Sequence, residues 1–132
     1  MHANAPELSA PKQLETVMIA CLVFVLMLSG TLLIPAVRPF FAAMHGGNEG
    51  GMHAFFSVNM LGAALGAPLA GLLADRMGAR RRVVVVLAFL DGCLLLLAAS
   101  PLPLAVVLVL RTVQGAANVG ALSVLMLSLI HI

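Results

Sequence analysis

Four long apolar stretches, separated by short polar segments, dominate the chain. Residues 17–37 contain no charged side chain and are followed by Arg38, and residues 55–74 are also free of charge. Residues 83–100 are interrupted only by Asp91, and residues 102–130 carry a single charge, Arg111. Because about 20 helical residues span the roughly 30 Å apolar core of a bilayer, the pattern predicts an all-α membrane protein with four transmembrane helices. Residues 1–16 are expected to form a polar tail before the membrane part, residues 17–132.

Composition supports a membrane protein and excludes several other classes. Hydrophobic residues make up 62% of the chain and charged residues 9%, and the mean hydropathy is +1.13, values far from those of a soluble domain. The net charge of +2 comes mainly from one segment, so no nucleic-acid partner is expected. Cys21 and Cys93 are interpreted as small buried hydrophobes, and His45 and His53 as loop residues without ligand partners. No metal, cofactor or enzymatic activity is predicted.

Small residues recur at helical spacing within residues 55–74. Gly62, Gly66 and Gly71, with neighbouring alanines, predict that this helix makes close contact with others. Pro68 is expected to lie inside the helix, because neighbouring groups in a bundle can satisfy the carbonyl that it frees. The glycine-rich residues 38–53 predict an external loop, and the charged residues 75–82 predict a compact turn.

The basic residues are concentrated in one of the connections. Four of the seven Lys and Arg residues lie between the second and third apolar stretches, against Arg38 alone in the first loop. By the positive-inside rule, residues 75–82 and the amino terminus are cytoplasmic. We therefore expect a multi-pass protein of a bacterial inner membrane, with the lipid bilayer as its surroundings.

The segment GLLADRMGARRR, residues 71–82, resembles the signature that major facilitator superfamily transporters carry between their second and third helices. Its basic run departs from the pattern at Ala79, where the family usually has Lys or Arg. The matching residues are Gly71, Asp75, Arg76, Gly78, Arg80 and Arg81. The resemblance implies that the four helices are part of a six-helix half of a twelve-helix fold.

Asp75 is the residue of this segment that most needs a partner. A carboxylate at the carboxyl end of a helix is unfavourable for the helix dipole, so a loop arginine or the amino-terminal end of another helix should compensate it. The resemblance implies the second role, in which the motif acts as a conformational switch by contacting a helix of the carboxy-terminal half. The alternative is an Asp that is merely solvated at a helix end.

A second motif, RTVQGAAN at residues 111–118, forms a polar stripe on the fourth apolar stretch. Arg111, Gln114, Gly115 and Asn118 follow the spacing i, i+3, i+4 and i+7, which places them on one helix face. The spacing resembles the fourth-helix motif of proton-coupled carriers, although Ala117 stands where Gly is usual. The resemblance implies proton coupling or lining of the substrate cavity for this stripe, and the alternative is an arginine that only holds helices together.

Asp91 is the one charge of the third stretch and matches neither motif. Asp91 and Arg111 each lie ten positions from Pro101, at the turn between two antiparallel helices. Residues equidistant from such a turn lie at the same depth, so an intramembrane ion pair between them is predicted, which would lower the cost of both charges.

The predicted function is secondary active transport of a small solute by alternating access, coupled to protons, as in drug or metabolite efflux. The last six residues read LSLIHI, which looks like a translated transposase end sequence from a sequencing adapter. We therefore expect a fragment that lacks the carboxy-terminal helices of its carrier and is inactive by itself. The alternatives are a small dimeric multidrug carrier, which would need a membrane Glu absent from residues 17–37, and a four-helix membrane scaffold.

Overall fold

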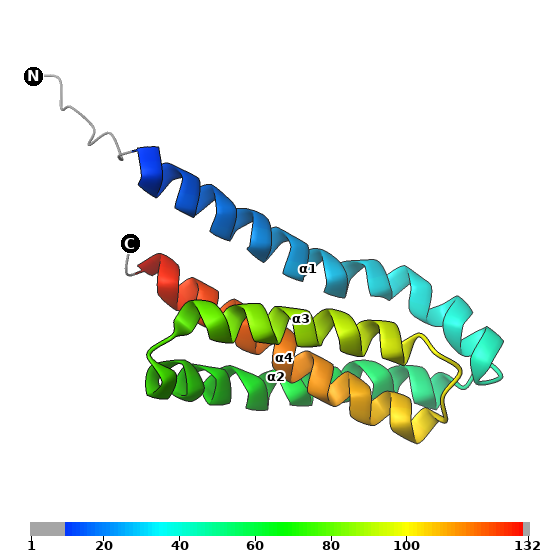
Figure 1. The fold of residues 1–132 in the computed structure, drawn as a ribbon. Coiled ribbons are helices and arrows are strands. Elements are labelled where there is room, and N and C mark those ends of the chain that lie inside the picture. The colour runs from blue at the N-terminus through cyan, green and yellow to red at the C-terminus, as the bar shows by residue number, and fades with distance from the viewer. Residues whose placement is uncertain (1–9, 131–132) are drawn as a thin grey trace, which may run out of the picture.

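The computed structural model describes residues 10–130, which form four α-helices and no strand (Figure 1). The helices are α1 (Ala10–Met44), α2 (Glu49–Met77), α3 (Arg80–Ala98) and α4 (Leu104–Ile130). By length and composition, α1, α2 and α4 can cross a membrane. The all-α membrane fold is therefore as the apolar pattern predicts.

The third helix departs from the expected set of four spans. α3 has 19 residues, begins with three consecutive arginines and has Asp91 near its middle. It is therefore not among the described helices that are long and apolar enough to cross a membrane. Within the bundle, α3 lies beside α4 and runs along it (Figure 1).

The helices extend beyond the apolar stretches that predict them. α1 begins at Ala10 and runs to Met44, so the tail expected at residues 1–16 is helical from residue 10, and residues 1–9 lie outside the described range. The expected loop at residues 38–53 shrinks to residues 45–48, where Gly46 and Gly47 have positive φ angles of 62° and 73°. Backbone hydrogen bonds continue through the polar interface, so charge marks the edge of the apolar core and not the helix end.

Two helices, α2 and α4, pack with their backbones in direct contact. A Cβ atom at Gly62 would lie 2.8 Å from the carbonyl carbon of Thr112, and one at Gly66 would lie 2.7 Å from that of Ala116. The expected close contact is confirmed at these two glycines. A Cβ at Gly71 would meet nothing within 4 Å, so the close approach expected there is absent among the described residues. α2 continues through Pro68, as expected.

The first helix is packed far less closely than the others. Its amino-terminal half diverges from α3 and α4, and it approaches them toward its carboxyl end (Figure 1). Cys21 on α1 and Cys93 on α3 are both exposed, which corrects the expectation that they are buried. An apolar stretch in a membrane protein has a lipid-facing side as well as a packed side, so hydrophobicity alone does not indicate burial.

Candidate functional site

A cluster of five polar side chains lies inside the bundle, between two apolar clusters. One apolar cluster includes Leu26 and Ala121, and the other includes Val37 and Val107. On α1 and on α4, the polar residues fall between these two positions in sequence. We call them the polar cluster, and they are Ser29 of α1, Asp91 of α3, and Arg111, Gln114 and Asn118 of α4.

The spacing along α4 brings its three polar residues onto one face. Arg111 and Gln114 are 3% and 2% exposed, and Asn118 is half-buried one turn further on. Gly115, predicted to belong to the same stripe, instead packs against α2, where a Cβ would lie 2.7 Å from the side-chain oxygen of Asn59. Gly115 therefore serves helix contact and does not line the polar cluster.

Asp91 is the acceptor at the centre of the cluster and is only 3% exposed. Gln114 Nε2 donates to Asp91 Oδ1, and Asn118 Nδ2 donates to Asp91 Oδ2 at 3.2 Å. Ser29 Oγ lies 3.5 Å from the same Oδ2 and completes the set from α1. A buried carboxylate is costly unless it is hydrogen-bonded, so these donors account for its presence at this depth.

Arg111 is connected to Asp91 through Gln114 and not directly. Arg111 Nη1 donates to Gln114 Oε1, and the other end of the same amide donates to Asp91. Within residues 10–130 the ion pair of the structure is Arg80 with Asp75. The predicted direct pair of Asp91 with Arg111 is therefore replaced by an amide bridge, because the intervening Gln114 lies on the same face of α4.

The guanidinium of Arg111 has further unusual surroundings. Its Cζ lies 4.7 Å from the centre of the Phe55 ring, in the geometry of a cation–π contact. Its Nε is buried and has no hydrogen-bond partner among the described residues. An arginine has five N–H donors and remains charged in proteins. Arg111 thus keeps hydrogen-bonding capacity that the described residues do not use.

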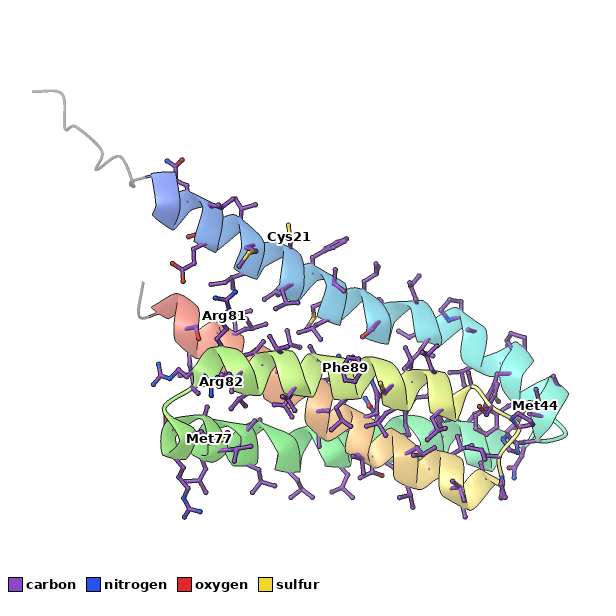
Figure 2. The ribbon with its side chains drawn as sticks, viewed as in Figure 1. Cys21, Met44, Met77, Arg81, Arg82 and Phe89 are labelled. Carbon is purple, nitrogen blue, oxygen red and sulfur yellow. The ribbon has the colours of Figure 1, made fainter. Side chains whose placement is uncertain are left out.

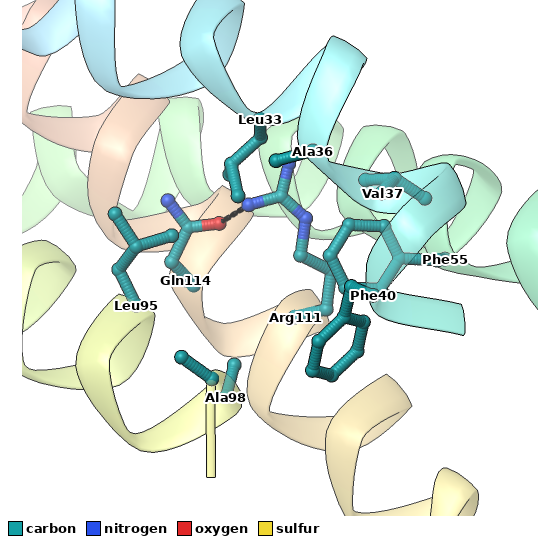
Figure 3. Close-up of a pocket in the computed structure, with 10 residues that line it drawn as sticks. Leu33, Ala36, Val37, Phe40, Phe55, Leu95, Ala98, Arg111 and Gln114 are labelled. Atoms are coloured by element: carbon teal, nitrogen blue, oxygen red, sulfur yellow. Dashed lines mark hydrogen bonds between the residues drawn. The ribbon is translucent and has the colours of Figure 1, made fainter. Parts of the chain in front are cut away.

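A cavity of about 150 Å³ lies beside Arg111 and Gln114. Its walls are mainly apolar and come from all four helices, with Leu33 and Phe40 of α1 on one side and Leu95 and Ala98 of α3 on the other (Figure 3). Figure 3 also shows Gln114 directed toward the guanidinium of Arg111. The arrangement is an apolar space with one cation at its edge.

Ser29 is the member of the cluster that sequence reasoning missed. Asn118 Nδ2 lies 3.3 Å from Ser29 Oγ and 3.2 Å from the backbone oxygen of Leu26, so one amide contacts α1 twice. Ser29 is one of two hydroxyl residues in the otherwise apolar residues 17–37, the other being Thr31. That scarcity is the only signal in the sequence that could have marked it.

The charged segment lies at the far end of α2, away from the polar cluster. Asp75 is paired with Arg80 at 3.4 Å, and their side chains are 66% and 39% exposed. Gly78 has a φ of 58° and caps α2 in the left-handed region, which favours glycine because a Cβ is strained there. Arg76 lies in the last turn of α2, and Arg81 lies in the first turn of α3 (Figure 2). These residues make a tight charged corner between two helices.

Comparison with known proteins gives one match. A family model described as Major Facilitator Superfamily matches residues 19–131. No curated protein and no solved structure gives a significant match to the chain. The matched range contains the polar cluster, the cavity and the charged corner.

Proposed function

Because the chain belongs to the Major Facilitator Superfamily, a family of secondary transmembrane transporters, we propose that it carries part of the path of a proton-coupled carrier. Its solute would be a small molecule moved by alternating access, as in drug or metabolite efflux. The chain is a multi-pass membrane protein, with helices long and apolar enough to cross a bilayer. No covalent chemistry on the solute is part of this proposal.

The polar cluster is the observation that supports the proposal most directly. Placing a charged residue at the centre of a membrane helix costs at least about 2.5 kcal/mol on insertion scales. Asp91 and Arg111 are both almost fully buried, and an apolar cavity adjoins Arg111. Buried charges beside a cavity are typical of ion and substrate pathways, so Arg111 and Gln114 are proposed to contact the solute or the coupling proton.

The charged corner is proposed to act as the conformational switch. Asp75 is bonded to Arg80 yet remains two-thirds exposed, which leaves its carboxylate accessible to a further helix. An exposed pair of this kind contributes only about 0–1 kcal/mol to stability, so Asp75 can exchange partners at low cost. We propose that the partner is a helix of a carboxy-terminal half that lies outside this chain.

The arginines of the charged corner also support an orientation of the chain across the membrane. We propose that the charged corner and the amino terminus face the cytoplasm of a bacterium, and that residues 45–48 face outward. The arginines then lie at the anionic cytoplasmic leaflet, where each contributes about 1 kcal/mol of attraction.

The test is transport by a carrier that contains this chain together with the carboxy-terminal half proposed above. Reconstituted in vesicles with a pH-sensitive dye inside, it should show solute-dependent proton flux. The Arg111→Gln variant should lose that flux, whereas the matched variant Arg82→Gln, at an exposed position outside the polar cluster, should keep it. A carrier whose solute flux is unaffected by a proton gradient would contradict the coupling. The 132-residue chain alone should show no flux.

A further inference from the structure

The attachment of α1 to the other helices depends on very few polar contacts. Within residues 17–126, hydrogen bonds link α1 to the other helices only at Ser29 and at the carbonyl of Leu26. Every one of these bonds involves Asp91 or Asn118. Within the same residues, 17–126, α1 is otherwise attached by apolar packing, and much of it is exposed.

From this arrangement we propose that Asp91 is a proton-binding site whose charge holds α1 against α3 and α4. The inference deepens the proposed function, because it names the residue that would bind the coupling proton and the helix that would respond. The resemblance to proton-coupled carriers points to Arg111. In this proposal Asp91 binds the proton, and Arg111 is the charged group connected to it through Gln114.

The hydrogen bonds explain why the charge of Asp91 matters to α1. Hydrogen bonds to an ionised carboxylate are roughly twice as strong as those between neutral groups. Asn118 Nδ2 donates to Asp91 Oδ2 at 3.2 Å, and the Ser29 hydroxyl lies 3.5 Å from the same oxygen as a weaker, second contact, so a proton on that oxygen would weaken both interactions. Ser29 also lies 2.8 Å from the backbone oxygen of Leu26, so its hydroxyl has another acceptor within its own helix. Protonation therefore loosens the link between α1 and α3.

Among residues 10–130, Asp91 is the acidic residue that is buried inside the bundle. Through Gln114 it is connected to Arg111 on α4, and no ionisable side chain of α1 or α2 forms a hydrogen bond or ion pair with it in the described residues. The other acidic residues within residues 10–130 are Glu15, Glu49 and Asp75, and all three are exposed. Of the four carboxylates within residues 10–130, Asp91 is the buried one and the one that contacts donors from α1 and α4, so a response of α1 to protonation is assigned to it.

A proton fits this site better than a sodium ion. The oxygens that could coordinate a cation are those of Leu26, Ser29 and Asp91, and Asn118 Nδ2 lies 3.2, 3.3 and 3.2 Å from them. The amide nitrogen thus occupies the space that a cation would need. A proton requires no such space, because it binds directly to the carboxylate oxygen.

Beside the amino-terminal half of α1 there is space into which this helix can move. A cavity of about 480 Å³ separates α1 from α3 and α4 near Glu15, Cys21 and Arg81, where α1 diverges from its neighbours (Figure 2). This space lies beyond Ser29 toward the amino terminus, where Ile19, Leu22 and Val23 still pack against an apolar cluster, so release at Ser29 removes a polar restraint and leaves this half of α1 held by apolar contacts.

The two native cysteines report this movement without new substitutions. Cys21 lies on α1 and Cys93 on α3, both are exposed, and the sequence contains no other cysteine. Spin labels on both, in the 132-residue chain in lipid nanodiscs, give the distance between α1 and α3 by pulsed electron resonance. Spectra are taken from roughly pH 3 to 9, which brackets the ordinary carboxyl and histidine ranges.

We expect a short, narrow distance distribution at high pH and a longer, broader one at low pH. Asp91→Asn should give the low-pH distribution at every pH, and Glu15→Gln, which removes the other carboxylate near α1, should leave the wild-type response unchanged. Ser29→Ala keeps Asp91 and removes only the contact from α1. Ser29→Ala should lengthen the distance between Cys21 and Cys93 at high pH and reduce its change with pH. If Asp91→Asn does not fold, the Ser29→Ala result tests the proposal in its place.

Three results would overturn the proposal. The first is a wild-type distance that does not change with pH, and the second is a response that persists in Asp91→Asn. The third is a shift produced by sodium at constant pH, which would make the site a cation site. None of these depends on solute flux, so a carrier that transports while its α1 ignores pH would refute the inference and leave the proposed function standing.

Discussion

Replacing Gly66 by alanine tests whether backbone contact between α2 and α4 holds the bundle together. The added Cβ would lie 2.7 Å from the carbonyl carbon of Ala116, whereas carbon atoms pack best at about 3.5–4.0 Å. The two helices must therefore separate by about 0.8 Å or more at this point. Because the obstacle is backbone and not a flexible side chain, rotamer changes cannot relieve it.

The size of the effect follows from two opposing terms. Overpacking of a well-packed core costs about 1–3 kcal/mol, and replacing glycine by alanine within a helix contributes about 0.5–1 kcal/mol in the favourable direction. Gly66→Ala should therefore destabilise the bundle by about 1–2 kcal/mol. Gly71→Ala is the matched control, since it lies on the same helix and its Cβ would meet nothing within 4 Å. Its effect should be neutral or stabilising by up to about 1 kcal/mol.

The assay is unfolding of the purified chain in mixed micelles by increasing SDS, followed by circular dichroism. The midpoint should fall for Gly66→Ala and should hold or rise for Gly71→Ala. Equal midpoints for the two variants would refute the reasoning, because they would show that the crossing of α2 and α4 tolerates a methyl group.

Three further predictions concern topology and charge. With single cysteines in a Cys-free background, an impermeant thiol reagent should label Met44→Cys but not Met77→Cys in intact cells, and the reverse labelling would invert the proposed orientation. In the full-length carrier, Asp75→Asn should strongly reduce transport while membrane yield stays normal, since its exposed ion pair contributes about 1 kcal/mol at most; normal turnover would leave Asp75 a solvated helix end. Arg111→Gln and Asp91→Asn should each lower folded yield, because either change leaves the other buried charge without its counter-charge across Gln114, and stranding a buried charge costs about 3–5 kcal/mol; the double variant should regain yield. Strictly additive losses would mean that the two charges are not coupled through the bridging amide.

The sequence is sufficient to locate the helices but not their ends. Charge-free stretches near 20 residues indicate helices because a bilayer core excludes charge, yet α1 starts seven residues before its apolar stretch does. Helical hydrogen bonding is local and continues wherever water or lipid headgroups can solvate the side chains. The ends at Ala10 and Met44 therefore have no counterpart in the hydrophobic pattern.

The polar cluster was predictable on one helix and not across helices. Spacing alone places Arg111, Gln114 and Asn118 on one face of α4, and the structure shows Gln114 between the two charges. The contribution of Ser29 depends on how α1 is rotated about its own axis, which a nearly uniform apolar sequence does not encode. The glycines show the same limit, because Gly66 and Gly71 are alike in sequence and differ only in whether another backbone lies opposite.

The contact of α2 with α4 has a mechanical consequence. Helices that slide past one another usually do so on a layer of side chains that can change rotamer. At Gly62 and Gly66 that layer is missing, and the backbone of α2 rests directly on Thr112 and Ala116 of α4. We therefore expect α2 and α4 to move together as one rigid unit, because no layer of side chains between them can repack. We expect movement within this part of the chain to occur between α1 and the α2–α4 pair, because α1 makes the least contact with the other helices.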